Sequence, residues 1–392
     1  MEWLRRHRDE NNLSRQGVKL KFDNSTMAEI ANIAQLSNSI NQTSDLFKND
    51  WAIWTDGSIT IGEIEETSIS STKGIKSNGI TIGIDKIIDK NQMYGAAIRI
   101  EDDENDIGTS GTKLNTDGYS LSFYGTFPLS DNTYIDSTLG FGLLRTDLTR
   151  KHQSGTLSGT REAEQMFGSI LYGAESLLYG AESNNNQLTL SLYGRVDAGY
   201  TKLKSYSDSG TVAAINYNKQ QIKTARASIG ILVDDEIKIR EITFMPNARL
   251  EFGRDIIDSS DAVVSYIVYP DTNYTLNIDQ EEKDNFRLGV GADIEVEGGW
   301  LFMTDYEKNQ RGSRLEGYSV ENTISMGVSF QPNSSTEYNL LLIKGDASNR
   351  QIGLDLDKKL NDNWSFNVGL GVAGTSTSGY NNTAKFSTRL SF

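Results

Sequence analysis

Ala384-Lys-Phe-Ser-Thr-Arg-Leu-Ser-Phe392 is the stretch that decides the fold, and it ends on an aromatic residue. Successive side chains of a β-strand point to opposite faces. One face of this strand would carry the mainly apolar set Phe386, Thr388, Leu390 and Phe392. A soluble protein gains little from ending within a strand, because terminal residues usually fray. The last strand of a closed membrane barrel must instead pair with the first, and its terminal Phe can join the aromatic girdle at the membrane surface. The ending predicts a transmembrane β-barrel.

The composition is compatible with such a barrel and excludes several other classes. At 392 residues the chain can hold two ordinary domains or one large all-β unit. No apolar run is as long as a transmembrane helix requires, and the mean hydropathy is −0.46. A net charge of −15 argues against a nucleic-acid partner. With no Cys, the chain has neither disulfides nor thiolate metal sites, and the sequence suggests no cofactor.

Residues 1–48 are predicted to be a linker that precedes the barrel. Residues 1–8 have the positive charge of a signal peptide but no apolar core behind it, so we expect the tail of a longer exported protein. From Asn24 or Ser25 as a cap, apolar residues recur at helical spacing to about Phe47, and the other face is polar but nearly uncharged. This helix of about 24–48 is either an ordinary packing helix or one that lies in the lumen of the barrel.

A period of two begins at Trp51 and continues to the end of the chain. Apolar and polar residues alternate, for example, over 80–85, 119–127, 188–197 and 364–372. Strands of this length, repeated this often, are uncommon in soluble β-sandwiches. We therefore predict that residues 49–392 form one antiparallel up-and-down barrel.

The connections between the strand-like segments alternate in length. Counted from Trp51, the odd-numbered gaps are long, at roughly 65–73, 103–115, 150–160, 205–215 and 258–283, and the even-numbered gaps are short turns. Long loops at one end and tight turns at the other are typical of outer-membrane barrels. The count places Phe392 at the short-turn end, which is then periplasmic, with the long loops outside the cell.

The order of these segments resembles the C-terminal translocator domain of autotransporters, the proteins of type V secretion. The matching landmarks are Trp51-Ala-Ile-Trp54, Gly79-Ile-Thr-Ile-Gly-Ile-Asp85, Met93-Tyr-Gly-Ala-Ala97, Tyr119-Ser-Leu-Ser-Phe-Tyr-Gly125, Tyr206-Ser-Asp-Ser-Gly210, Pro246-Asn-Ala-Arg-Leu-Glu-Phe252 and Thr388-Arg-Leu-Ser-Phe392. The resemblance covers about residues 49–392 and rests on the order of the landmarks. It implies a barrel in the Gram-negative outer membrane, a linker helix in its pore, and an upstream passenger that the barrel helps to deliver to the cell surface.

Two features depart from the family pattern. The family barrel has twelve strands, whereas about sixteen strand-like segments can be counted here, the surplus lying near 336–344, 350–358, 363–374 and 384–392. In addition, Leu171-Tyr-Gly-Ala-Glu-Ser176 recurs as Leu178-Tyr-Gly-Ala-Glu-Ser183. The offset of seven is odd, so we expect one copy to lie in a turn or a bulge.

The candidate site residues have physical rather than catalytic roles. Seven charged residues on the polar faces of strands are predicted to line the lumen: Arg99, Arg195, Asp197, Arg249, Glu251, Arg287 and Asp293. The alternative is that they are merely paired interior charges. The resemblance also implies that the terminal strand, through Phe386, Thr388, Leu390 and Phe392, is recognised by the outer-membrane barrel assembly machinery.

Chemistry of other kinds has little support in the sequence. His152 lies in a predicted loop without an evident Ser or Asp partner. The acidic run over 101–106 matches an EF-hand loop poorly, because Ile107 and Leu114 fall where oxygen ligands belong. Asn11-Asn12 is similar to the Asn pairs at which some autotransporters cleave themselves, but it lies far before Trp51.

The prediction from the sequence is a monomeric translocator and anchor, embedded in outer-membrane lipid and not an enzyme. Two other classes stay open. A general diffusion channel would conduct ions whether or not residues 24–48 were deleted. An outer-membrane hydrolase would lose its activity on the substitution His152→Ala.

Overall fold

The computed structural model describes residues 51–392, apart from 65–72, 90–91, 180–187, 260, 278–282, 314–316, 346–349 and 376–378. The linker over 1–48, with its predicted helix at about 24–48, lies outside the described residues. So does Asn11-Asn12. Among the residues that are described, no helix is long and apolar enough to cross a membrane.

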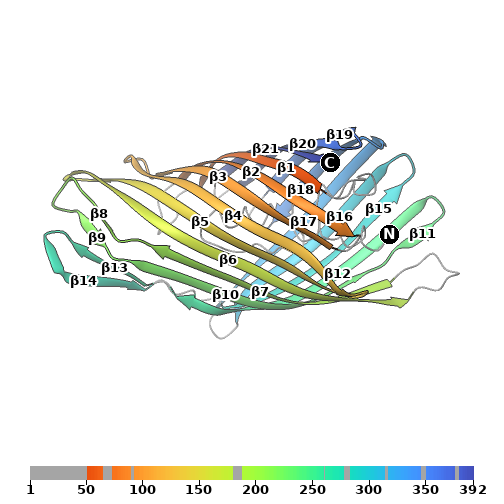
Figure 1. Ribbon diagram of the computed structural model, residues 1–392, viewed down its shortest axis with the longest axis horizontal. Coiled ribbons are helices and arrows are strands. Elements are labelled where there is room, and N and C mark those ends of the chain that lie inside the picture. Colours follow the sequence, from red (N-terminus) through yellow and green to blue (C-terminus); the bar gives the residue numbers. More distant parts are fainter. Residues whose placement is uncertain are drawn as a thin grey trace.

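Sixteen antiparallel strands form one closed barrel (Figure 1). In the order of the ring they are β1 (Trp51–Ile64), β2 (Lys73–Asp89), β3 (Gln92–Ile107), β4 (Thr112–Ser130), β5 (Thr133–His152), β6 (Gly155–Tyr179), β7 (Leu188–Leu203), β10 (Gln220–Asp234), β12 (Ile242–Ser259), β15 (Asp284–Val296), β16 (Trp300–Ser313), β17 (Gly317–Asn333), β18 (Thr336–Gly345), β19 (Arg350–Asn361), β20 (Trp364–Thr375) and β21 (Gly379–Ser391). A short strand, β11 (Ile237–Ile239), adds to β12. The barrel thus has sixteen strands rather than the twelve of the family pattern, because the four late segments form β18 to β21 within the wall.

The first and last strands close the ring. β1 pairs with β21 from Ala52 opposite Ser391 to Glu63 opposite Tyr380. The backbone N–H of Phe392 donates a hydrogen bond of 2.9 Å to the carbonyl of Trp51. Closure leaves no unpaired strand edge in the ring, which is what a spanning sheet requires in lipid.

The strands have an apolar outer face and a polar inner face. On β4 the side chain of Leu121 is 38% exposed, whereas its neighbour Ser122 is 5% exposed. Outward-facing Ile, Leu, Val, Phe and Tyr side chains continue this exposed apolar surface around the barrel. The period of two therefore separates a lipid-facing surface from a polar interior.

The wall of the barrel is much taller on one side than on the other. Strands β4, β5 and β6 have 19, 20 and 25 residues, whereas β18, β19 and β20 have 10, 12 and 12. The predicted long loops at 103–115 and 150–160 are wrong, because both segments continue their strands into tight turns. Their charged residues lie on strand ends beyond the apolar surface, where the outward face carries ion pairs such as Lys204 with Glu162.

Two further predicted loops, 205–215 and 258–283, contribute strands to a second sheet, and the predicted loop at 65–73 lies almost wholly outside the described residues. The order of the second sheet is β14 (Tyr269–Asn277), β13 (Asp261–Tyr266), β9 (Ile215–Tyr217) and β8 (Tyr206–Ser207). These strands lie at the left end of the barrel in Figure 1, beside the tips of β5 and β6. We call this end the mouth.

The repeated hexapeptide lies at the opposite end of β6. The first copy, over 171–176, is within the strand, and the register against β7 shifts between Leu177 and Tyr179. Most of the second copy lies outside the described residues.

Candidate functional site

Four side chains meet inside the barrel where the ring closes; we call them the seam cluster: Trp54, Asp85, Tyr124 and Arg389. Arg389 on β21 donates to the two carboxylate oxygens of Asp85 on β2, at 2.6 and 3.1 Å. Tyr124 on β4 donates to Asp85 at 3.3 Å and accepts a hydrogen bond of 2.9 Å from the indole of Trp54 on β1. Because β1 lies between β21 and β2, the Arg389–Asp85 pair joins the two strands that flank β1.

Two glycines make room for the rings of the seam cluster. A Cβ at Gly83 would lie 2.2 Å from the ring of Trp54, and a Cβ at Gly95 would lie 2.5 Å from that of Tyr124. The rings can therefore lie flat against the strands and exclude water from the ion pair. Arg389 and Asp85 are 1% and 0% exposed, and a buried pair of this kind is stable only when its hydrogen bonds are made.

Arg99 on β3 is the first of the predicted lumen charges, and its side chain is buried against residues of β2 and of β3 itself. Its Nε donates to Glu101 at 3.0 Å, and its Nη1 donates to the hydroxyl of Thr81 at 3.2 Å. A Cβ at Gly79 would overlap the guanidinium, so this glycine provides the space for it.

Three more of the predicted charges come together on β7 and β12. Arg195 donates to Asp197 at 2.9 Å and lies 3.5 Å from Glu251. Ser169 on β6 donates to the same Asp197 at 2.7 Å, and Tyr193 donates to Glu251 at 2.6 Å. Charges of both signs are thus paired on the inner wall.

Arg249 and Arg287 share one acidic partner, Glu307 on β16. Their Nη2 atoms donate to its two oxygens at 2.8 and 2.7 Å. Asp293 lies on the same face of β15 as Arg287 and is partly exposed. The structure therefore places Arg99 at one position on the inner wall, whereas the Arg195 group and the Arg249–Arg287 pair lie next to each other on β12, where Glu251 and Arg249 are two residues apart.

The terminal strand has the alternation that its sequence predicts. Phe386, Leu390 and Phe392 are exposed on the outer face, while Ser387, Arg389 and Ser391 are buried on the inner face. Thr388 shares the outer face and accepts a hydrogen bond of 2.8 Å from the indole of Trp364.

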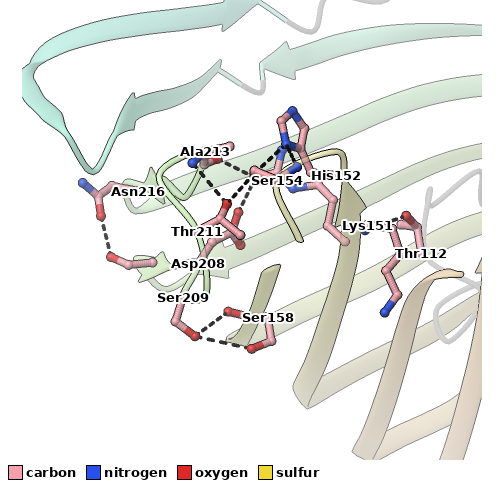
Figure 2. Close-up of polar contacts among 12 residues, drawn as sticks. Thr112, Lys151, His152, Ser154, Ser158, Asp208, Ser209, Thr211, Ala213 and Asn216 are labelled. Atoms are coloured by element: carbon pink, nitrogen blue, oxygen red, sulfur yellow. Dashed lines mark hydrogen bonds and ion pairs between the residues drawn. The ribbon is translucent and has the colours of Figure 1, made fainter. Parts of the chain in front are cut away.

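Figure 2 shows a polar group at the mouth that contains His152. The Nδ1 atom of His152 lies 2.8 Å from the Ser154 hydroxyl, which itself donates to Thr211 at 3.0 Å. The nearby carboxylate of Asp208 is paired with Arg150 instead. A hydrolytic Ser–His–Asp site needs the acid to orient the imidazole, and here the acid orients an arginine.

A second mouth contact attaches the small sheet to β6. The rings of Tyr206 and Tyr217 are stacked with centroids 4.6 Å apart, and the guanidinium of Arg161 lies 5.6 and 5.9 Å from the two centroids. Arg161 also donates to the carbonyls of Lys204 and Asn218. Burial lowers the pKa of Arg161 from its ordinary value.

The acidic run over 101–106 lies on β3, and its side chains point alternately inward and outward. Among the described residues, no three His, Asp or Glu side chains are grouped as metal ligands. The alternation of inward and outward residues along each strand is enough to identify Glu101 and Glu307 as inward-facing. No pattern in the sequence, however, shows that Asp85 and Arg389 meet, because they are 304 positions apart.

The profile of the autotransporter beta-domain family matches residues 53–307 of this chain, which is more than half of its length. The chain belongs to the autotransporter beta-domain family. This family is one of outer-membrane translocator barrels rather than enzymes, and the closed barrel with its apolar outer surface has that architecture.

Two curated relatives and two solved structures are similar to this autotransporter barrel. Outer membrane protein B of Rickettsia prowazekii is 22% identical over 329 residues, covering 77% of this chain and 19% of that protein. The same protein of Rickettsia typhi is 23% identical over 283 residues, covering 66% and 16%. The chain thus spans less than a fifth of the length of these relatives.

Among solved structures, the translocator domain of the autotransporter NalP from Neisseria meningitidis is 13% identical with a TM-score of 0.46, covering 93% of this chain and 98% of that chain. The toluene transporter TbuX from Ralstonia pickettii is 9% identical with a TM-score of 0.47, covering 88% and 90%.

Proposed function

We propose that this barrel anchors an autotransporter in the outer membrane and helps to deliver an N-terminal passenger to the cell surface. The observation that supports the proposal is a closed barrel whose inner wall is polar and whose buried arginines are already paired with acidic side chains of the wall. Such a wall can solvate a polypeptide without binding it tightly, since these arginines need no partner from the chain in transit. Arg99, Arg195, Asp197, Arg249, Glu251, Arg287 and Asp293 would then line the path.

The proposal is tested in the complete reading frame that encodes this chain. The upstream polypeptide should become accessible to external protease in intact cells, and should stay inside when the barrel is replaced by an unrelated outer-membrane anchor. An upstream polypeptide that stays inside the cell with the native barrel would contradict the proposal. Stable ion conductance of the purified protein, unchanged when residues 24–48 are deleted, would favour a diffusion channel instead.

The proposed orientation places the mouth outside the cell and the C-terminus in the periplasm. The sequence of this chain has no Cys, so a single introduced cysteine is the only thiol of the barrel itself. In intact cells a membrane-impermeant maleimide should label Ser154→Cys at the mouth, and should label Asp362→Cys in the turn between β19 and β20 only after the outer membrane is opened. The reverse labelling pattern would show that the barrel has the opposite orientation in the membrane.

We further propose that the terminal strand is the signal that the barrel assembly machinery recognises, and that the assembled barrel is a monomer. Phe386, Leu390 and Phe392 support this role because they form an exposed apolar row on the strand that closes the ring. A single species of monomer mass in native detergent extracts is the expected result. A stable oligomer would contradict the monomer.

A further inference from the structure

The second sheet continues the tall wall beyond the closed ring. β8 follows β7, and β13 follows β12, while β9 and β14 lead directly into β10 and β15. Ser158 on β6 and Ser209 after β8 exchange backbone hydrogen bonds of 2.9 and 2.8 Å, which join the two sheets. β14 is the last strand of this extension, and among the described residues no strand pairs with its outer edge.

The edge of β14 has few of the features that protect sheet edges. Proteins usually block an exposed edge with Lys, Pro or a bulge, because its free N–H and C=O groups can pair with another chain. Pro270 stands near the start of β14, but residues 271–277 contain no Pro, Lys or Arg. The side chains of Tyr269 to Leu276 are all exposed.

A row of aromatic side chains leads across the second sheet to this edge. Tyr206, Tyr217, Val264 and Tyr274 are successive cross-strand partners, so they share one face. Tyr266 contacts Tyr274 edge-to-face at 6.2 Å. The row begins over Arg161 and Gly159, which belong to the inner face of β6. We call Tyr206, Tyr217 and Tyr274 the tyrosine row; it continues the inner face of the barrel past the mouth.

The direction of the chain indicates what can pair with this edge. Trp51 lies beside Phe392, so the chain that precedes Trp51 starts from the end opposite the mouth. Read from its N-terminus, a chain that passes from the mouth to Trp51 runs in the direction of β14 and opposite to β12 and β13. Fifty residues precede Trp51, and at about 3.3–3.6 Å per extended residue they can span the barrel. The relatives are about five times longer than the matched region.

We propose that the edge of β14 and the tyrosine row form a docking edge, which receives the extended polypeptide that leaves the barrel, the chain before Trp51, as an added parallel strand. Backbone pairing along β14 holds the strand without regard to its sequence, and the tyrosine rings cover its inward side chains. The inference rests on the proposed function. The fifty residues before Trp51, which start at the end opposite the mouth, favour this occupant over a second copy in the same membrane.

Photo-crosslinking in the complete reading frame tests the docking edge. Tyr274→p-benzoylphenylalanine places the probe on the tyrosine row, and Thr275→p-benzoylphenylalanine is the matched control on the opposite face of the same strand. During export, the Tyr274 probe should crosslink within the same polypeptide, to residues before Trp51, and the Thr275 probe should do so much less. A crosslink to a second barrel copy, or equal yields from the two probes, would overturn the docking edge.

Export kinetics separate this inference from the proposed function. Lysines at the edge, Asn273→Lys with Thr275→Lys, should slow the surface appearance of the passenger several-fold. Val212→Lys, which adds a charge at an exposed site away from the edge, should leave the rate unchanged. Heat-resistant mobility in gels confirms that each barrel has folded. Normal surface appearance in the edge variant overturns the docking edge alone, whereas no surface appearance with the native barrel overturns both proposals.

Discussion

The seam cluster and the mouth use the same kinds of side chain under opposite conditions. At the seam, Arg389 and Asp85 are 1% and 0% exposed and lie within the membrane-spanning wall. At the mouth, Lys204 and Glu162 form an ion pair of 2.9 Å with both side chains about half exposed. Water can replace either partner at the mouth but not at the seam, so the same ion-pair chemistry is structurally required at one place and dispensable at the other.

The largest effect is expected from breaking the seam pair. Arg389→Ala leaves Asp85 buried without its cation, and should cost about 3–5 kcal/mol of the unfolding free energy. The measurement is a urea titration of the barrel refolded in lipid. The double variant Arg389→Ala with Asp85→Ala is the control and should recover much of the loss, because no unpaired charge is then buried. Equal losses for the single and double variants would show that the ion pair is not what stabilises the seam.

The next effect concerns the two faces of the wall between the seam and the mouth. Leu121→Arg places a charge on the lipid face and should cost about 2–4 kcal/mol if the position lies near the bilayer midplane. Ser122→Arg, one residue along the same strand, points inward and should cost far less. The same titration compares the two. Equal costs would contradict the assignment of inner and outer faces.

Removing the terminal aromatic should have a smaller effect on the finished barrel. Full burial of such a side chain is worth about 1.5–3 kcal/mol, and Phe392 is 53% exposed, so its deletion should cost less than that range. The refolded variant should keep most of its heat resistance. In cells, the same variant should accumulate in the periplasm or be degraded. Normal outer-membrane levels would show that the terminal strand is not an assembly signal.

The smallest effect is expected at the mouth. Glu162→Ala removes the partner of Lys204 on the outward face, and the unfolding transition should not move measurably, at low or at high salt. Glu101→Ala removes the partner of buried Arg99 and serves as the comparison, because it should shift the same transition clearly. A loss at Glu162 as large as at Glu101 would remove the distinction between the two regions.

The sequence by itself determined the all-β class, the inside–outside alternation and the closing strand. A period of two is a local property of the chain, so Arg389 could be assigned to the inner face and Leu390 to the outer face without knowledge of their neighbours. The twelve-strand pattern that the family resemblance implies did not determine the strand count. It followed from the late segments, each of which has its own alternation.

Only the tertiary structure decided which inner charges meet and where the strands end. Asp85 and Arg389 become partners because closing the ring places β2 and β21 on either side of β1, and no local pattern encodes that distance. The segments at 103–115 and 150–160 look like loops because charged residues replace the apolar face of a strand that has left the membrane. The sequence pattern did not predict the second sheet, for a related reason. Its strands are short, and they are stabilised by pairing with one another and by Arg161 rather than by their own periodicity.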